Sequence, residues 1–247
     1  MENRGILLRF GIFLVVLSMI AGVGVGIIGR LYSPPVQAIQ PLSSSAPITV
    51  VLDAGHGGED GGAVGVSGVY EKDLNLSIAL ILRELLVANG VDVILTREDD
   101  RLLYDTTVDY HGRKKALDLA ARRKIAEETP NAVFVSIHMN SYPQAQYRGL
   151  QVWYSPNDAR SEALAAHVQE RVAANLQREN DRSIKKATSS IYLLHHLQVP
   201  SILIECGFLS NAEDCACLED VGYQRQLALQ IMLALCASFS SPSALSP

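Results

Sequence analysis

Residues 48–62 read ITVVLDAGHGGEDGG, an apolar run that leads directly into a loop with five glycines. Such a run is typical of a buried strand, and glycine lets the backbone after it turn tightly and come close to a ligand or an ion. His56 lies inside that loop. The stretch therefore predicts a strand whose carboxyl end presents a histidine at a binding site.

The residues beyond this loop alternate short apolar runs with longer stretches of helical period. Strands are predicted at 48–52, 91–95, 132–137, 150–154 and 201–204, and helices at 74–89, 117–128, 158–177 and 224–238. This alternation is the pattern of an α/β protein. We expect a single-domain, twisted, mostly parallel or mixed sheet with helices on both faces. Residues 98–113 show no period and predict a surface loop.

The N-terminal part of the chain predicts a membrane segment. Residues 11–28 (GIFLVVLSMIAGVGVGII) carry no charge and are just long enough to span a bilayer. We interpret residues 1–30 as an uncleaved anchor, with a cleaved signal as the alternative and Val36-Gln37-Ala38 as a weak cleavage site. Residues 31–47 then form a Pro/Ser-rich tether, residues 48–240 the folded domain and residues 241–247 a flexible tail. In either case the domain is exported, as a membrane-anchored or a secreted protein.

Charge and cysteine content argue against a nucleic-acid partner and against a disulfide-stabilised scaffold. The formal net charge is −5, and residues 1–38 carry more basic than acidic side chains, so the folded domain is more acidic still. Nucleic acid is therefore an unsuitable partner, whereas a neutral or zwitterionic polymer is compatible. The four cysteines lie in the last fifth of the chain and do not resemble a disulfide framework. Cys215-x-Cys217 has no second pair with the spacing of a zinc site.

Four candidate site residues come together at one edge of the predicted sheet. His56, His138 and Glu205 each follow or end a predicted strand, and Glu71 opens the first long helix. In open α/β sheets the carboxyl ends of the strands form the ligand crevice. A glutamate that ends an apolar strand must face an ion, a cation or a polar cleft, because an unpaired charge is costly in a core.

Each of these residues also has an ordinary explanation. Glu71 alone could complement a helix dipole, and a lone His138 could be structural. The glycine loop lacks both G-x-G-x-x-G and a following Lys-Ser/Thr, so a nucleotide-phosphate loop is a weak alternative. Asp53 is expected either to orient His56 or to cap the glycine turn. Cys206 should point into the core, on the face opposite Glu205.

Taken together, the residue types favour metal-assisted hydrolysis. Two imidazoles and one carboxylate make an open catalytic zinc set, in which the fourth position is left for water. The second carboxylate can then serve as a general base. Zn²⁺ is therefore the expected cofactor.

Four motifs in order carry a family resemblance: LDAGHGGEDGGAVG (52–65), YEKDLNL (70–76), FVSIHMNS (134–141) and ILIECGFLSN (202–211). The chain resembles the zinc-dependent N-acetylmuramoyl-L-alanine amidases. The resemblance implies that His56, Glu71 and His138 bind zinc and that Glu205 is catalytic. It also implies hydrolysis of the amide bond between N-acetylmuramic acid and the L-alanine of the peptidoglycan stem peptide.

The segment 110–122 is similar to the germination-specific branch of that family. This similarity implies removal of whole stem peptides from spore cortex, which prepares the sugars for conversion to muramic δ-lactam. Peptidoglycan would be the substrate, and the need for an activating protein partner stays open. The rival functions are a non-catalytic peptidoglycan-binding module and a zinc deacetylase or carboxypeptidase that acts on the same polymer.

Overall fold

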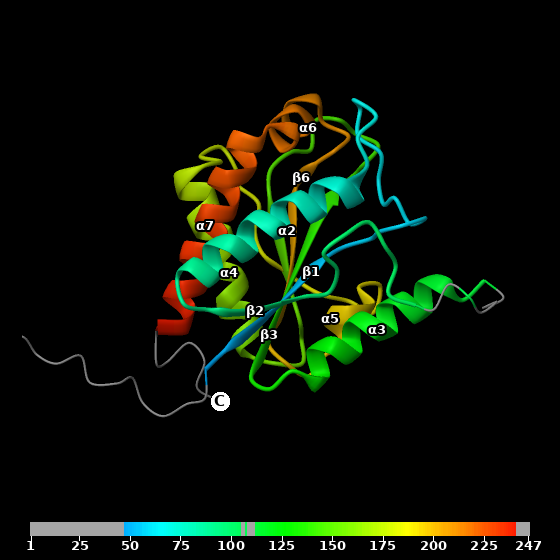
Figure 1. The fold of residues 1–247 in the computed structure, drawn as a ribbon. Coiled ribbons are helices and arrows are strands. Elements are labelled where there is room, and N and C mark those ends of the chain that lie inside the picture. Colours follow the sequence, from blue (N-terminus) through cyan, green and yellow to red (C-terminus); the bar gives the residue numbers. More distant parts are fainter. Residues whose placement is uncertain (1–46, 105–106, 108–111, 241–247) are drawn as a thin grey trace, which may run out of the picture. The chain divides into compact units, whose positions relative to one another are not determined.

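The computed structural model describes residues 47–104, 107 and 112–240. These residues form one six-stranded sheet with helices packed against it (Figure 1). The strands are β1 (Thr49–Ala54), β2 (Asp92–Leu95), β3 (Ala132–Asn140), β4 (Gln151–Tyr154), β5 (Lys185–Lys186) and β6 (Ser201–Phe208). The helices are α2 (Glu71–Ala88), α3 (Lys114–Glu128), α4 (Arg160–Asn175), α5 (Tyr192–His196), α6 (Ala212–Glu219) and α7 (Val221–Ser240).

The sheet is mixed, with strand order β2-β1-β3-β6-β4-β5. The strands β2, β1, β3 and β6 run parallel to one another, whereas β4 is antiparallel to β6 and parallel to β5. The central strands are buried on both faces, which explains why they read as continuous apolar runs. The carboxyl ends of β1, β3 and β6 consequently meet at one edge.

The two faces of the sheet have separate cores. On one face α2, α4 and α7 pack over a core that includes Val50, Ile137 and Ile204, and on the other α3 and α5 cover Val51, Phe134 and Leu203 (Figure 1). Alternation along each strand therefore sends Asp53, Ser136, His138 and Glu205 toward the side of α3 and α5. The candidate site lies on this second face.

The predicted fold class is confirmed, but several predicted ends are wrong. Strands β3 and β6 continue past the predicted ends at 137 and 204 and carry His138 and Glu205 within the sheet. Helix α2 begins at Glu71 rather than at 74. The short elements β5, α5 and α6 were not predicted. Between residues 98 and 113, the described residues form neither helix nor strand, as expected.

The predicted anchor (1–30) lies outside the described residues, as do the tail (241–247) and all but the last residue of the tether. Across residues 47–104, 107 and 112–240, no helix is both long and apolar enough to cross a membrane.

Candidate metal centre and catalytic cleft

His56, Glu71 and His138 converge at the carboxyl edge of the sheet. One nitrogen of each imidazole and one oxygen of the carboxylate lie within 4.8 Å of one another. Glu71 Oε1 is 3.3 Å from His56 Nε2 and 2.9 Å from His138 Nδ1. Donor atoms around one tetrahedral zinc ion are separated by roughly 3–4 Å. The donor types and their spacing thus fit a divalent cation such as zinc.

Glu71 owes its position to the first turn of α2. Its Oε2 accepts a hydrogen bond from the Ala63 amide and its Oε1 accepts one from the Met139 amide. Burial alone would raise the pKa of this carboxyl, but the hydrogen bonds and charge of His138 and His56 hold the pKa well below its ordinary value. Glu71 is therefore an anionic ligand candidate over the whole physiological range.

Glycine makes room for the three side chains. A Cβ atom added to Gly55 would collide with the imidazole of His138, and one added to Gly62 would collide with Glu71 and His56. Gly62 also has a φ of +67°, in the region that favours glycine. The density of glycines in this loop thus follows from the close packing of the candidate ligands against backbone.

His56 adopts an uncommon backbone conformation and has an acidic neighbour. Its φ is +63°, which is unusual for a residue with a side chain. Its Nδ1 lies 2.9 Å from Oδ2 of Asp60. Burial lowers the pKa of His56, but the contacts and charges of Glu71 and Asp60 outweigh burial and raise it. Asp60 is the carboxylate next to the second imidazole nitrogen of His56, although the pair does not have the alignment of a hydrogen bond. No sequence signal pointed to Asp60.

Two fully buried arginines hold the backbone that carries His56. Arg122 donates to the carbonyl oxygens of Ala54 and His56 at 2.8 and 2.7 Å. Arg97 donates to the carbonyls of Ala54 and Gly55 at 2.8 and 3.0 Å. Because a guanidinium has five donors in a rigid fork, each arginine fixes several carbonyls at once. Sequence reasoning noted Arg122 only through resemblance and missed Arg97.

Asp53 has neither of the two roles that the sequence suggested. Its carboxylate accepts hydrogen bonds from Arg122 at 2.6 Å, Thr96 at 2.7 Å and Ser136 at 2.6 Å. Burial would raise the pKa of Asp53, but the Arg122 charge and the two hydroxyl donors lower it below its ordinary value. Asp53 is the buried counter-ion of Arg122, and it acts on His56 only through that arginine.

Glu205 stands next to the three candidate ligands. It pairs with His138 across the β3–β6 ladder. Its Oε2 is buried without a hydrogen-bond partner among the described residues. Burial raises the pKa of Glu205 to about 7. A carboxyl group with this pKa can exchange a proton near neutrality, as a general base must.

These residues line a cleft of about 240 Å³ on the α3 and α5 side of the sheet. His56, His138 and Glu205 form part of its wall, and Tyr192 and Leu193 of α5 form another part. A cleft with a polar end and an apolar wall can hold an uncharged sugar or peptide segment beside the candidate ligands.

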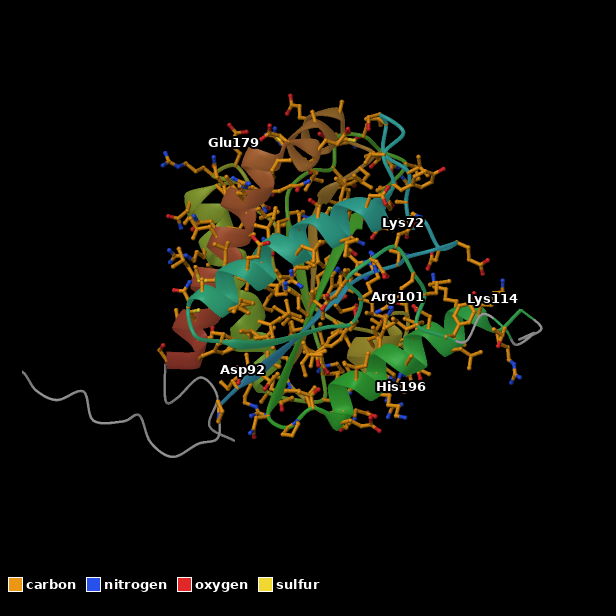
Figure 2. The ribbon with its side chains drawn as sticks, viewed as in Figure 1. Lys72, Asp92, Arg101, Lys114, Glu179 and His196 are labelled. Carbon is orange, nitrogen blue, oxygen red and sulfur yellow. The ribbon has the colours of Figure 1, made fainter. Side chains whose placement is uncertain are left out.

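Two lysines outside the glycine loop stabilise it through a hydrogen bond and ion pairs. Lys72 donates to the Gly58 carbonyl at 2.8 Å and pairs with Asp100 at 2.6 Å. Lys114 pairs with Glu59 at 2.9 Å. Figure 2 shows Lys72 and Lys114 on the right of the view, each at the start of its helix. Both lysine charges are therefore paired with carboxylates at the loop.

Among the described residues, the other histidines and cysteines do not form a second centre. No other group of three or more His, Cys, Asp or Glu in the described part of the chain is placed to hold a metal ion. Figure 2 shows His196 near α3, and its Nδ1 contacts the Tyr192 carbonyl at 2.9 Å. Cys206 is fully buried in the opposite core, as predicted, and the four cysteines are free thiols. Asn211 caps α6 with its side chain.

Fold and site together define a class of hydrolytic enzymes whose candidate metal-binding His and Glu residues lie at the carboxyl edge of an α/β sheet. The family model for N-acetylmuramoyl-L-alanine amidase matches residues 50–237. The chain therefore belongs to the N-acetylmuramoyl-L-alanine amidase family and is an enzyme of that activity, as the motifs implied.

Individual relatives agree with this assignment. The germination-specific N-acetylmuramoyl-L-alanine amidase of Bacillus subtilis is 36% identical over 200 residues, which cover 81% of this chain and 82% of that protein. The CwlD amidase of Clostridioides difficile, solved in complex with the GerS lipoprotein, superposes with a TM-score of 0.74 at 40% identity, covering 78% of this chain and 98% of that one. The catalytic domain of CwlV from Bacillus (Paenibacillus) polymyxa gives a TM-score of 0.66 at 33% identity over 78% of this chain and 98% of that one.

Proposed function

We propose that His56 Nε2, Glu71 Oε1 and His138 Nδ1 hold a zinc ion and that Glu205 is the general base for hydrolysis of the amide between N-acetylmuramic acid and L-alanine. The observation that carries this proposal is the unpartnered, buried Oε2 of Glu205 on the strand next to His138. When bound there, zinc lowers the pKa of a water molecule to about 7 and polarises the substrate carbonyl.

The residues of the chain supply the proton transfers and the orientation. Glu205 takes a proton from the attacking water and, as the protonated acid, delivers it to the nitrogen of the leaving alanine. Asp60 places a negative charge beside the other nitrogen of His56, and Arg122 fixes the His56 carbonyl. The peptide leaves with a free amino terminus.

Product masses from a defined muropeptide test this function. An amidase releases the intact stem peptide and leaves the lactyl carboxylate on the sugar. Loss of acetate would instead indicate a deacetylase, and loss of a single residue would indicate a carboxypeptidase. Binding without any product would indicate a non-catalytic module.

His138→Ala should lose both metal and turnover, and full metal occupancy in that variant would contradict the ligand assignment.

We further propose that the substrate is the peptidoglycan of the spore cortex. The similarity to the germination-specific amidase of Bacillus subtilis supports this choice. Expression of the chain in a Bacillus subtilis strain without its own germination-specific amidase should restore muramic δ-lactam to the cortex, and Glu205→Gln should not. Restoration of vegetative-wall turnover alone would contradict the cortex assignment.

We also propose that the domain 48–240 works outside the cytoplasm, held by an N-terminal anchor (1–30) through the tether (31–47). Peptidoglycan lies outside the cytoplasmic membrane, and residues 11–28 are uncharged and apolar. The location is then the cell wall or the space between the forespore membranes.

A further inference from the structure

A second hollow lies beside Glu205, on the same face of the sheet as the candidate metal centre. It measures about 370 Å³, and its wall includes Tyr147, Gln151, Trp153, Arg182, Lys185 and Phe208. We call it the cationic hollow, because its lining residues include an arginine and a lysine but neither aspartate nor glutamate.

The cationic hollow lies next to Glu205 across the sheet. His138, Glu205 and Gln151 are direct neighbours across β3, β6 and β4. Adjacent strands are about 4.8 Å apart, so β5, which carries Lys185, lies about 10 Å from Glu205. An extended peptide advances about 3.3 Å per residue. The hollow is therefore within reach of the first two or three residues of a peptide attached at the metal centre.

Arg182 has a donor left for a further anion, because its guanidinium forms no ion pair with a carboxylate of the described residues. Its Nη2 donates to Gln151 Oε1 at 2.6 Å, and its guanidinium lies 4.7 Å from the centroid of the Phe208 ring. Its Nε is buried and has no hydrogen-bond partner among the described residues. No ion pair joins Arg182 or Lys185 to an acidic side chain within that part of the chain. The Lys185 ammonium lies 5.1 Å from the Trp153 ring centroid.

We propose that the cationic hollow binds a carboxylate of the stem peptide while its bond to muramic acid is cut. This inference rests on the proposed function. Arginine recognises carboxylates through paired, charge-assisted hydrogen bonds. The rings of Phe208 and Trp153 hold the two cations in place. The sugar cannot be this ligand, because the carboxyl of its lactyl group is already part of the scissile amide. The peptide carries the free carboxylates of the substrate.

Two muropeptides that differ at one group test the proposal. In one the second peptide residue has a free carboxylate, and in the other that carboxylate is a primary amide. The full-length, zinc-loaded enzyme should cleave the acid with a kcat/KM about 10- to 100-fold above that of the amide. Arg182→Gln should abolish this preference by slowing cleavage of the acid, with metal content unchanged, and Arg182→Lys should retain part of it.

Lys186→Gln is the matched control, because Lys186 neighbours Lys185 on the same edge strand but does not line the hollow. It should leave the preference intact.

Equal cleavage of acid and amide by the unmodified enzyme would overturn the carboxylate site and leave the amidase activity standing. An equal loss on both compounds in Arg182→Gln would overturn it too, and would mean that Arg182 supports cleavage without recognising the carboxylate. Absence of free stem peptide from either compound would overturn the proposed function and this inference with it.

Discussion

Glu205→Gln separates the proposed base from the proposed ligands. Glutamine keeps the shape of the side chain but cannot take a proton, so we expect kcat to fall about 10²- to 10⁴-fold. Metal content should stay unchanged, because Glu205 is not one of the three converging donors. Metal analysis and single-turnover kinetics on the same preparation check this. Retained turnover would require another base.

Asp53→Asn tests the buried pair beneath His56. The variant leaves Arg122 without its closest carboxylate partner, so we expect the free energy of unfolding to fall by about 3 kcal/mol. Asp118 still pairs with Arg122 and limits the loss. Urea denaturation measures it. The exposed Arg123–Glu127 pair provides the control, and Glu127→Gln should cost under about 1 kcal/mol.

The same pair predicts a pH dependence. Asp53 has a lower pKa in the folded protein than in the unfolded chain. Its full contribution to the free energy of unfolding is therefore present above the unfolded pKa of about 4. It is lost as the pH falls through the lower folded pKa. The stability gap between unmodified protein and Asp53→Asn should therefore narrow below pH 4. A gap that stays constant down to pH 2 would contradict this role.

At the scale of elements, the long periodic segments were predictable and the short ones were not. The helices α2, α3, α4 and α7 were found from their helical period and five strands from their apolar runs, because each contributes apolar side chains to one or both of the two cores. The elements β5, α5 and α6, with 2, 5 and 8 residues, are too short for a period to show. Asn211, followed by Glu213 and Asp214, was a helix-start signal that could have revealed α6.

The convergence of the four candidate residues was predictable, but the contacts that support them were not. Strand ends and motif order pointed to His56, Glu71, His138 and Glu205. Arg97 and the pairing of Asp53 with Arg122 depend on contacts between segments far apart in sequence. Asp60 lies in the same loop as His56, but only the conformation of that loop brings its carboxylate next to the imidazole. Alternation along β1 fixes the face of Asp53, but only the packing of α3 on that face shows which side chain meets it.

Asn211→Ala tests the cap of α6. The Asn211 side chain accepts from the amides of Glu213 and Asp214, so we expect a loss of about 1 kcal/mol in the free energy of unfolding. Asn211→Ser, which retains a capping oxygen, should lose only a fraction of that. Thermal denaturation of the three proteins in parallel gives the comparison. Equal losses in both variants would mean that the cap contributes nothing.

For the whole molecule, metal binding should raise the free energy of unfolding. An ion that binds only the folded chain, at a free concentration 1,000 times its Kd, adds about 4 kcal/mol. For a domain of this size we expect the Tm to fall by about 10 °C after chelation and to recover when zinc is added. His138→Ala is the control and should show no response. An identical response in that variant would place the zinc elsewhere.

Removal of residues 1–47 should release the protein from membranes. The remaining chain begins just before β1 and contains every element of the sheet. Cell fractionation should find the full-length chain with the membrane and the shortened chain, exported by a cleavable signal, in the soluble fraction. Membrane retention of the shortened chain would contradict the anchor.

The place of β6 in the sheet has a consequence for biosynthesis. It lies between β3 and β4, although it is the last strand in the described part of the chain. Glu205 can therefore join the other three residues only after nearly the whole polypeptide has emerged, and contacts of such long sequence separation form slowly. A nascent or partly translocated chain has no complete reaction centre. This built-in latency would keep a wall-cutting enzyme harmless until its folding is finished.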